Sequence, residues 1–445
     1  MGRSIPRGAL LHALQRYTDR IIAEGDTTIR ALQVQNRRQT RRLADELSID
    51  WVDDPNSARS VVGAADWPAL ADSFRANGYE IHRLSGVDSY AAEAVYSVGD
   101  SAKNGSRSAQ RAGLGAIWQV RPGQLQPSAD AQDFVGTIDA VYTWVDSSDP
   151  HWQANYHRAV AGAMGVVNDS SVDPGRFESR DELRYSLRSL ESHLPWVNKV
   201  YLVTAGQRPE WLVDAHPRLE VIDHRDIFAS PEQCLPTFNS HAIESQLSRI
   251  DGLSEHFLYV NDDVFFGRPL HPNLFFGPAG QTKYALTNTH FTQAEERDLP
   301  VNAAAANNRE LVATRYERTT SRKFKHVAHP QRRTVLQKIA EEFADDIEAT
   351  AAHRFRHPDD ISIPSSLAHQ VAARMGLGFP TDVEYSYLDI GADDFLLQCL
   401  RLLRTAAPDM FCINEVRQPR EGELLRKVLQ QVLHGMYPVP SSFER

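Results

Sequence analysis

Cysteine and long apolar runs are scarce in this chain. Its 445 residues include three cysteines, Cys234, Cys399 and Cys412, which are too few and too scattered for a disulfide framework or a zinc cluster. No apolar run approaches the roughly 18–20 residues that a membrane-spanning helix needs, and the N-terminal residues lack the apolar core of a signal peptide. We therefore expect a soluble protein of a reducing compartment, most simply the cytoplasm.

Positive charge is also in short supply. Lys and Arg total 48 against 58 for Asp and Glu, so the formal charge is −10. Such an acidic protein is a poor general binder of nucleic acid, and we expect no nucleic-acid partner. Hydrophobic residues, by contrast, make up 42% of the chain. The chain can bury a substantial core, and its length suggests two or three domains or one large α/β domain with additions.

One region departs from this acidic balance. Residues 1–47 hold nine Arg and five acidic residues, and Arg37, Arg38, Arg41 and Arg42 lie together on a predicted helix. These arginines form either a solvated helix face or a surface that docks on anionic membrane or on a partner. The second alternative would bring the protein to the inner face of the plasma membrane or into a homo-oligomer.

Strands and helices alternate in the middle of the chain. This pattern is typical of a mainly parallel sheet covered by helices, so the predicted fold class is α/β. The predicted strands are 138–145, 199–204, 219–222 and 257–260, and the predicted helices are 180–194 and 240–250. The predicted parts of the chain are a helical segment at 1–57, a small α/β region with a linker at 58–130, the α/β core at 131–325, and a mostly helical part at 326–445.

The end of one buried strand carries two neighbouring carboxylates. The apolar run 257–260 leads through Asn261 into Asp262 and Asp263. A parallel sheet places its ligands at the carboxyl ends of its strands, and a carboxylate pair there can hold Mg²⁺ or Mn²⁺ against a substrate phosphate. The alternative is that the pair only caps a helix or faces solvent.

Two further segments offer charged side chains near predicted strand or helix ends. The strand 138–145 contains Asp139 and ends at Asp146, in a loop that either faces a ligand or is only a turn. Ser179 is a predicted helix N-cap, with a capping box to Glu182. Arg180 and Arg184 lie beside this predicted helix N-terminus, where arginines suit phosphate binding. The alternative is a purely structural role for the segment.

Two segments carry histidines that could do acid–base work. His241 and Glu244 are three residues apart on a predicted helix and therefore share a face, toward an acceptor or toward solvent. His329 precedes Pro330, which fits a first helical turn. A histidine at a helix N-terminus is kept neutral and can act as a general base, although a structural role is the alternative.

The last two candidates lie late in the chain. Arg356 could neutralise phosphoryl oxygens in a transition state, or only form a surface salt bridge. Cys412 and Asn414 belong to a short segment that either returns to the active site and completes a metal shell or is an ordinary loop.

Taken together, these segments resemble the Stealth family of sugar-phosphate transferases. The resemblance covers four blocks in the family's order, and the second block is the most specific because it contains both the run 180–189 and the segment Asn261-Asp262-Asp263-Val264. In the first block, Ser147 and Ser148 stand between two carboxylates where a glycine is common, which affects only the expected loop shape. The blocks are 138–150, 179–276, 326–376 and 412–415.

The resemblance implies a nucleotide-sugar transferase-like core of the GT-A or Rossmann-like kind at 131–325, with 326–445 completing the active site. It implies transfer of hexose-1-phosphate from a UDP-sugar to a hydroxyl of a glycan acceptor in capsular or exopolysaccharide synthesis, which forms a phosphodiester and releases UMP. The alternatives are a metal-dependent glycosyltransferase that releases UDP and a non-catalytic glycan-binding scaffold.

The resemblance also suggests roles for the candidate residues. The implied cofactor is Mg²⁺ or Mn²⁺, and the implied base is His329. The expected metal ligands are Asp262, Asp263 and Asn414; the expected catalytic residues are His329, Arg356, Asp263 and Asp146; and the expected substrate-binding residues are Asp139, Arg180, Asp181, Arg184, His241 and Glu244.

Overall fold

The fold was analysed in a computed structural model, and the statements below refer to the residues that it describes. No helix among those residues is long and apolar enough to cross a membrane. The described residues are 9–10, 12, 29–53, 59–84, 89–94, 116–121, 132–163, 177, 179–291, 299–404, 407–414 and 422–445.

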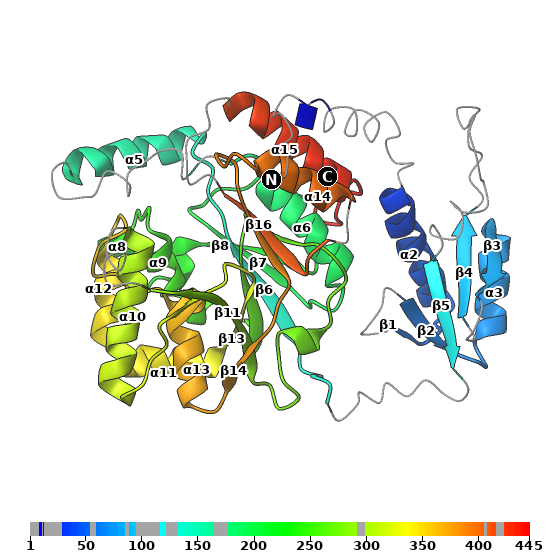
Figure 1. The fold of residues 1–445 in the computed structure, drawn as a ribbon, viewed down its shortest axis with the longest axis horizontal. Helices are drawn as coiled ribbons and strands as arrows, with labels where there is room; N and C mark the ends of the chain where they lie inside the picture. The colour runs from blue at the N-terminus through cyan, green and yellow to red at the C-terminus, as the bar shows by residue number, and fades with distance from the viewer. Residues whose placement is uncertain are drawn as a thin grey trace, which may run out of the picture.

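A small α/β unit precedes the core and lies to its right in Figure 1. Helices α2 and α3 pack on its five-stranded sheet, around Phe74 and Trp118. The predicted boundary at residue 57 is wrong, because the strand 51–53 pairs with 59–63 across it and Leu43 of α2 lies in the same core. Residues 95–115 and 122–130 of the predicted α/β region and its linker lie outside the described residues. The elements are α2 (Ile29–Glu46), α3 (Trp67–Ala76) and, in sheet order, β1 (Trp51–Asp53), β2 (Arg59–Gly63), β5 (Ala116–Arg121), β4 (Ser89–Ala94) and β3 (Tyr79–Arg83).

The core is built on a second five-stranded sheet. Its strand order is β13-β9-β6-β7-β8; four of its strands run parallel, and β13 is an antiparallel edge. The strands are apolar on both faces: β7 is buried throughout, and so is β6 up to its last residue. This confirms the predicted mainly parallel α/β core. The strands are β6 (Ile138–Thr143), β7 (Val200–Thr204), β8 (Leu219–Asp223), β9 (His256–Asn261) and β13 (His329–Arg332).

Helices cover both faces of this sheet. The leucine stripe of α6, Leu183, Leu187 and Leu190, packs on one face, as its 3.6-residue spacing predicts. Short helices and α11 cover the other face. The helices are α5 (Pro150–Ala163), α6 (Glu182–His193), α7 (His224–Ile227), α8 (Pro231–Cys234), α9 (Ser240–Glu244), η4 (Leu247–Arg249), η5 (Pro272–Leu274), α10 (Pro300–Tyr316), α11 (Arg333–Glu342), α12 (Ala344–Ala352), η6 (Ile363–Leu367) and α13 (Ala368–Arg374).

The C-terminal part contains strands as well as helices. The prediction that 326–445 is mostly helical missed four strands, because each is only four or five residues long. Two of them, β15 and β16, extend β10 into a small sheet, and β14 pairs with β11. The remaining elements are β10 (Val264–Phe266), β11 (Thr282–His290), β12 (Arg322–Phe324), β14 (Gly378–Thr381), β15 (Tyr385–Asp389), β16 (Met410–Asn414), α14 (Phe395–Arg404) and α15 (Gly422–Met436).

The C-terminal residues close over α6 through one buried carboxylate. Glu444 accepts hydrogen bonds from Arg188 at 2.7 and 2.8 Å and from Arg184 at 2.6 Å. These arginines hold the pKa of Glu444 at about 2, although burial alone would raise it. Nearby, Arg38 of α2 donates to Glu191 and to the backbone oxygen of Pro440, which links the N-terminal unit to this region.

Candidate active site

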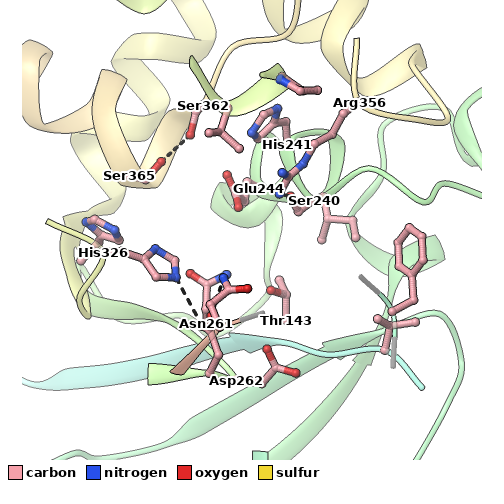
Figure 2. Close-up of a pocket in the computed structure, with 18 of the residues that line it drawn as sticks. Thr143, Ser240, His241, Glu244, Asn261, Asp262, His326, Arg356, Ser362 and Ser365 are labelled. Atoms are coloured by element: carbon pink, nitrogen blue, oxygen red, sulfur yellow. Dashed lines mark hydrogen bonds and ion pairs between the residues drawn. The ribbon is translucent and has the colours of Figure 1, made fainter. Parts of the chain in front are cut away.

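A cavity of about 740 Å³ opens where β6 and β9 end. Thr143 ends β6, and Asn261 ends the neighbouring β9. Both line the cavity, together with Asp262 and Asp263 (Figure 2). The cavity therefore lies at the carboxyl edge of a parallel sheet, where ligands of α/β folds bind.

Asp263 is the centre of a polar cluster on the cavity floor. After the turn at Asp262 and Asp263 the chain continues as β10, which pairs with β16 and so brings Cys412 and Asn414 alongside. Asp263 Oδ2 accepts from Cys412 Sγ at 3.1 Å and from Asn414 Nδ2 at 3.3 Å, and Oδ1 lies 3.3 Å from His326 Nε2. The structure thus brings Asp263 and Asn414 together, as the sequence predicted.

The carboxylates around this cluster are held in an unfavourable environment. Burial, reinforced by the charges of Asp263 and Glu182, raises the pKa of Asp262 well above its usual range. Burial likewise raises the pKa of Glu182 to about 7 and raises the pKa of Glu244. A bound cation would relieve this repulsion.

The donor atoms fit a hard divalent cation. Carboxylate oxygens and an amide oxygen are the ligands that Mg²⁺ and Mn²⁺ prefer, and Asp262, Asp263 and Asn414 offer them. Burial and the neighbouring Asp263 raise the pKa of the Cys412 thiol well above its usual value. Cys412 therefore stays protonated and acts as a donor to Asp263, rather than as a thiolate ligand.

A second group of polar side chains faces the cavity from α9 and the loop after α12. His241, Glu244, Ser240 and Arg356 all line it, on the side away from His326 (Figure 2). Arg356 donates to Ser240 Oγ at 2.9 Å, and Tyr259 donates to Glu244 Oε1 at 3.0 Å. His241 and Glu244 thus share a face, as their spacing predicted, and that face points into the cavity rather than to solvent.

His329 also lines the cavity, but not from a helix N-terminus. It is the first residue of β13 and pairs with Tyr259, and α11 begins only at Arg333. Its Nδ1 lies 3.0 Å from His369 Nε2, and burial, with His369 and His326 nearby, lowers its pKa well below the usual value. The predicted helical placement is wrong, because the edge of β9 captures this segment as a strand.

Two aspartates of the first conserved segment do not line the cavity. Asp139 lies near the start of β6, at the opposite end of the sheet, where it accepts from Asn198 Nδ2 and the Ser254 backbone, both at 2.8 Å. Its predicted place near the substrate is therefore wrong. Asp146 accepts from the Ser148 backbone at 2.8 Å. This contact is that of a simple turn, the alternative to a loop that faces a ligand.

The segment before α6 is only partly as predicted. The helix begins at Glu182 after Asp181, which has a positive φ of 65°, so the predicted Ser179 capping box is wrong. Glu182 instead accepts from the Arg180 backbone at 2.6 Å, and both residues line the cavity. Asp181 does not line it, and neither does Arg184, which points toward Glu444.

Several cavity residues carried no signal that singled them out in the sequence. His326 lies three residues before His329, so the same segment pointed to it without distinguishing the two histidines. Glu182 was assigned only a capping role. Others are Lys323, Lys325, Ser362, Ser365 and Ser366, which are common surface residue types and come together only through the η6 turn and the strands beside it.

Among solved structures, the galactosyltransferase LgtC in complex with donor and acceptor sugar analogs covers 68% of this chain and 98% of its own, at 9% identity and a TM-score of 0.33. A likeness this distant says nothing of function.

The curated relatives are closer. The exopolysaccharide phosphotransferase SCO2594 of Streptomyces coelicolor is 46% identical over 345 residues, which are 75% of this chain and 56% of that protein. The exopolysaccharide phosphotransferase CpsY of Mycobacterium tuberculosis is 35% identical over 336 residues, which are 74% of this chain and 62% of that protein. The chain thus spans between one third and three fifths of the length of the curated relatives it matches.

Four family models match this chain, in the order that the resemblance predicted. They are Stealth protein CR1, conserved region 1, at 136–162; CR2, conserved region 2, at 176–284; CR3, conserved region 3, at 325–373; and CR4, conserved region 4, at 401–445. Together they match just over half of the chain and contain every residue of the Asp263 cluster. The chain therefore belongs to the Stealth family.

Proposed function

We propose that this chain transfers hexose-1-phosphate from a UDP-sugar to a hydroxyl of a glycan acceptor, in capsular or exopolysaccharide synthesis. The acceptor oxygen bonds the sugar-bearing phosphorus, the bond from that phosphorus to UMP breaks, and the product is a phosphodiester. The proposal is supported by the relatives named exopolysaccharide phosphotransferase. The chain covers only part of those proteins, so activity, donor and acceptor are all proposals here.

The observation that carries the proposal is the Asp263 cluster beneath a cavity that also holds arginines. Asp263, with Asp262 and Asn414, would hold Mg²⁺ or Mn²⁺, which would neutralise charge on the diphosphate. Arg356 and Arg180 line the same cavity as these carboxylates. A cavity with both acidic and cationic walls suits a metal–diphosphate better than a neutral sugar alone.

The two arginines are positioned to hold phosphoryl oxygens. Arg356 is half-buried, and its contact with Ser240 fixes it beside His241 and Glu244. Burial lowers its pKa, but a guanidinium stays charged at neutral pH. Because phosphoryl transfer depends mainly on positioning and charge neutralisation, these fixed charges would supply much of the rate acceleration.

His326 has a place at the metal end of the cavity. Its contact with Asp263 Oδ1 would orient that carboxylate, in the manner of an outer-shell partner. His329 is a weaker candidate for the base, because burial lowers its pKa and its Nδ1 is within hydrogen-bond distance of His369 Nε2.

The proposal is tested by product analysis. The protein is incubated with a panel of UDP-sugars, Mg²⁺ or Mn²⁺ and short oligosaccharides, and phosphorus products are followed by ³¹P NMR. UMP together with a phosphodiester supports the proposal. UDP with a new glycosidic bond would establish the glycosyltransferase alternative, and oligosaccharide binding without turnover of any donor would favour a glycan-binding scaffold.

Contact with a membrane and assembly into a homo-oligomer stay proposals as well. The four arginines proposed to meet lipid already have partners in the fold. Arg38 bonds Glu191, Arg41 bonds Ser60 and lies over the Trp51 ring, and Arg42 bonds Glu46. Flotation with anionic vesicles at low salt tests the membrane contact, and analytical ultracentrifugation tests the oligomer.

A further inference from the structure

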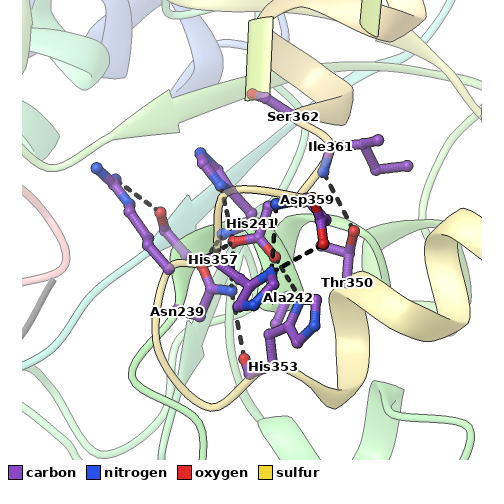
Figure 3. Close-up of polar contacts among 12 residues, drawn as sticks. Asn239, His241, Ala242, Thr350, His353, His357, Asp359, Ile361 and Ser362 are labelled. Atoms are coloured by element: carbon purple, nitrogen blue, oxygen red, sulfur yellow. Dashed lines mark hydrogen bonds and ion pairs between the residues drawn. The ribbon is translucent and has the colours of Figure 1, made fainter. Parts of the chain in front are cut away.

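A buried carboxylate lies directly behind the side of the cavity that His241 and Arg356 line. Asp360 is fully buried and follows Arg356 on the same loop. Its two oxygens accept from Asn239 Nδ2 at 2.8 Å, from His353 Nδ1 at 2.8 Å and from the His357 backbone at 2.9 Å, and Oδ2 lies 3.3 Å from His241 Nδ1 (Figure 3). Two imidazoles and an amide thus converge on one carboxylate.

This network joins α9 to the loop after α12, the two segments that carry His241 and Arg356. Asn239 caps α9 by accepting from the His241 backbone, and its amide donates to the His353 and Phe355 carbonyl oxygens as well as to Asp360. The Phe238 backbone donates to the Arg354 carbonyl oxygen at 2.7 Å. His241 and the loop of Arg356 therefore form one rigid unit.

The network also determines which nitrogen of His241 carries the proton. Burial alone would raise the pKa of Asp360, but hydrogen bonds from His241, His353 and the His357 backbone hold it well below its usual range, so the carboxylate is ionised and accepts only. His241 must then place its proton on Nδ1. Within the part of the chain that the structure describes, nothing is hydrogen-bonded to Nε2, and His241 lines the cavity.

We propose that His241 is the group that accepts the proton of the attacking acceptor hydroxyl, and that Asp360 is its positioning residue. As the acceptor oxygen bonds phosphorus and UMP leaves with the electron pair of the broken bond, the hydroxyl proton passes to Nε2 of His241. A histidine oriented by a buried carboxylate is a recurrent arrangement for general bases. The inference rests on the proposed function, because it names the acceptor side of that same site.

Several charged groups surround His241. Asp360 is the carboxylate partner of both His241 and His353, Glu244 lies one turn along α9, and Arg356 donates to the preceding Ser240. The two carboxylates favour a positive charge on the ring, whereas Arg356 and a protonated His353 oppose it. Replacing Asp360 by an amide removes a favourable charge in contact with the ring, so the pH profile of that variant should differ from that of the wild type.

The experiment measures UMP release as a function of acceptor concentration and pH. In His241→Gln, kcat/KM for the acceptor should fall about 10²–10⁴-fold, with the donor KM little changed. In Asp360→Asn, kcat/KM for the acceptor should also fall and its pH profile should change, because the ring loses the carboxylate that orients it. The matched control is Asp359→Asn, because this neighbouring carboxylate is exposed and contacts only His357 among the groups above, so its profile should match the wild type.

A measurement without substrate separates this inference from the proposed function. Histidine ¹⁵N NMR of the wild-type protein should show His241 protonated on Nδ1 and bare on Nε2, and Asp360→Asn should change that balance. A wild type that releases no UMP from any UDP-sugar would overturn the proposed function while NMR still decides the role of Asp360. Full activity in His241→Gln, or an Nε2-protonated His241 in the wild type, would overturn the inference. If Asp360→Asn does not fold, His241→Gln and the wild-type spectrum decide.

Discussion

Two groups of buried carboxylates in this protein differ in how completely they are neutralised. Glu444 is paired with Arg184 and Arg188 and keeps a pKa of about 2. The cavity group around Asp263 has carboxylate neighbours in Asp262 and Glu182, and burial raises the pKa values of those two residues. The first group is satisfied within the fold, and we expect the second to become favourable when a cation binds.

This difference separates a structural site from a ligand site. Buried charge without sufficient compensation costs stability, so a fold keeps it only where something else is bound or done. Arg184 illustrates the point, because its sequence neighbourhood suggested phosphate binding and its actual partner is Glu444. The following predictions test how far the contrast holds.

The largest effect is expected at Asp263. Asp263→Asn should lower the rate of UMP release on the order of 10³-fold or more, because it removes a proposed metal carboxylate from the reacting phosphates. The same change relieves repulsion with Asp262, so the melting temperature should stay equal or rise. Activity assays together with thermal unfolding check both parts, and a variant that is active but unstable would reverse the contrast.

The opposite pattern is expected at Glu444. Glu444→Gln leaves Arg184 and Arg188 without their anion and should cost about 3–5 kcal/mol of unfolding free energy. Turnover per folded molecule should change little, since Glu444 does not line the cavity. Urea unfolding measures this, with the exposed Glu423→Gln on α15 as the matched control. Equal urea midpoints for the two variants would contradict it.

Lowering the pH should reveal how much the ionised Glu444 contributes to stability. Because the folded pKa of Glu444 is about 2 against an ordinary value of 4.5, its contribution to stability is complete above 4.5 and is lost as the pH falls toward 2. Between neutral pH and pH 3, Glu444→Gln should therefore lose less stability than the wild type. Urea midpoints at the two pH values give the comparison, and parallel losses in both proteins would refute it.

Manganese should act on the cavity group only. At a concentration 100 times its dissociation constant, Mn²⁺ should add about 2.7 kcal/mol to the wild type. Asp263→Asn should gain much less, while Glu444→Gln should gain as much as the wild type. Thermal unfolding with and without Mn²⁺ shows whether the ion depends on Asp263, and an equal shift in Asp263→Asn would place the ion elsewhere.

The smallest effect is expected at Arg38, whose ion pair with Glu191 is partly exposed. Arg38→Ala should cost less than about 1 kcal/mol, because exposed pairs contribute little. It should also loosen the N-terminal unit from the core, so limited proteolysis should release residues 29–121 faster. A large loss of stability would mean that this contact matters more than a surface pair.

Much of the core was predictable because its signals are local. The strands β6, β7 and β9 are apolar runs, the α6 stripe has helical spacing, and the step from an apolar strand into Asp262 and Asp263 marks a ligand edge within a few residues. The shared face of His241 and Glu244 follows from their spacing alone.

The errors came from contacts that no local pattern encodes. The sequence predicted that His329 begins a helix. In the structure its segment pairs with strand β9 and forms a strand instead. Asp139 lies near the start of β6, whereas Asp262 follows the end of the parallel strand β9, so the two residues lie at opposite ends of the sheet and only Asp262 lines the cavity.

The sequence by itself determined the α/β core, the carboxylates at the end of β9 and the family, because strand periodicity and short motifs are written in adjacent residues. Only the tertiary structure decided which charges are satisfied. Glu444 meets Arg188 across 256 positions and Asp360 meets His241 across 119. Such pairs form where packing brings distant segments together. Once buried, a carboxylate that has a cationic partner stabilises the fold, and one that lacks such a partner is left able to bind a ligand.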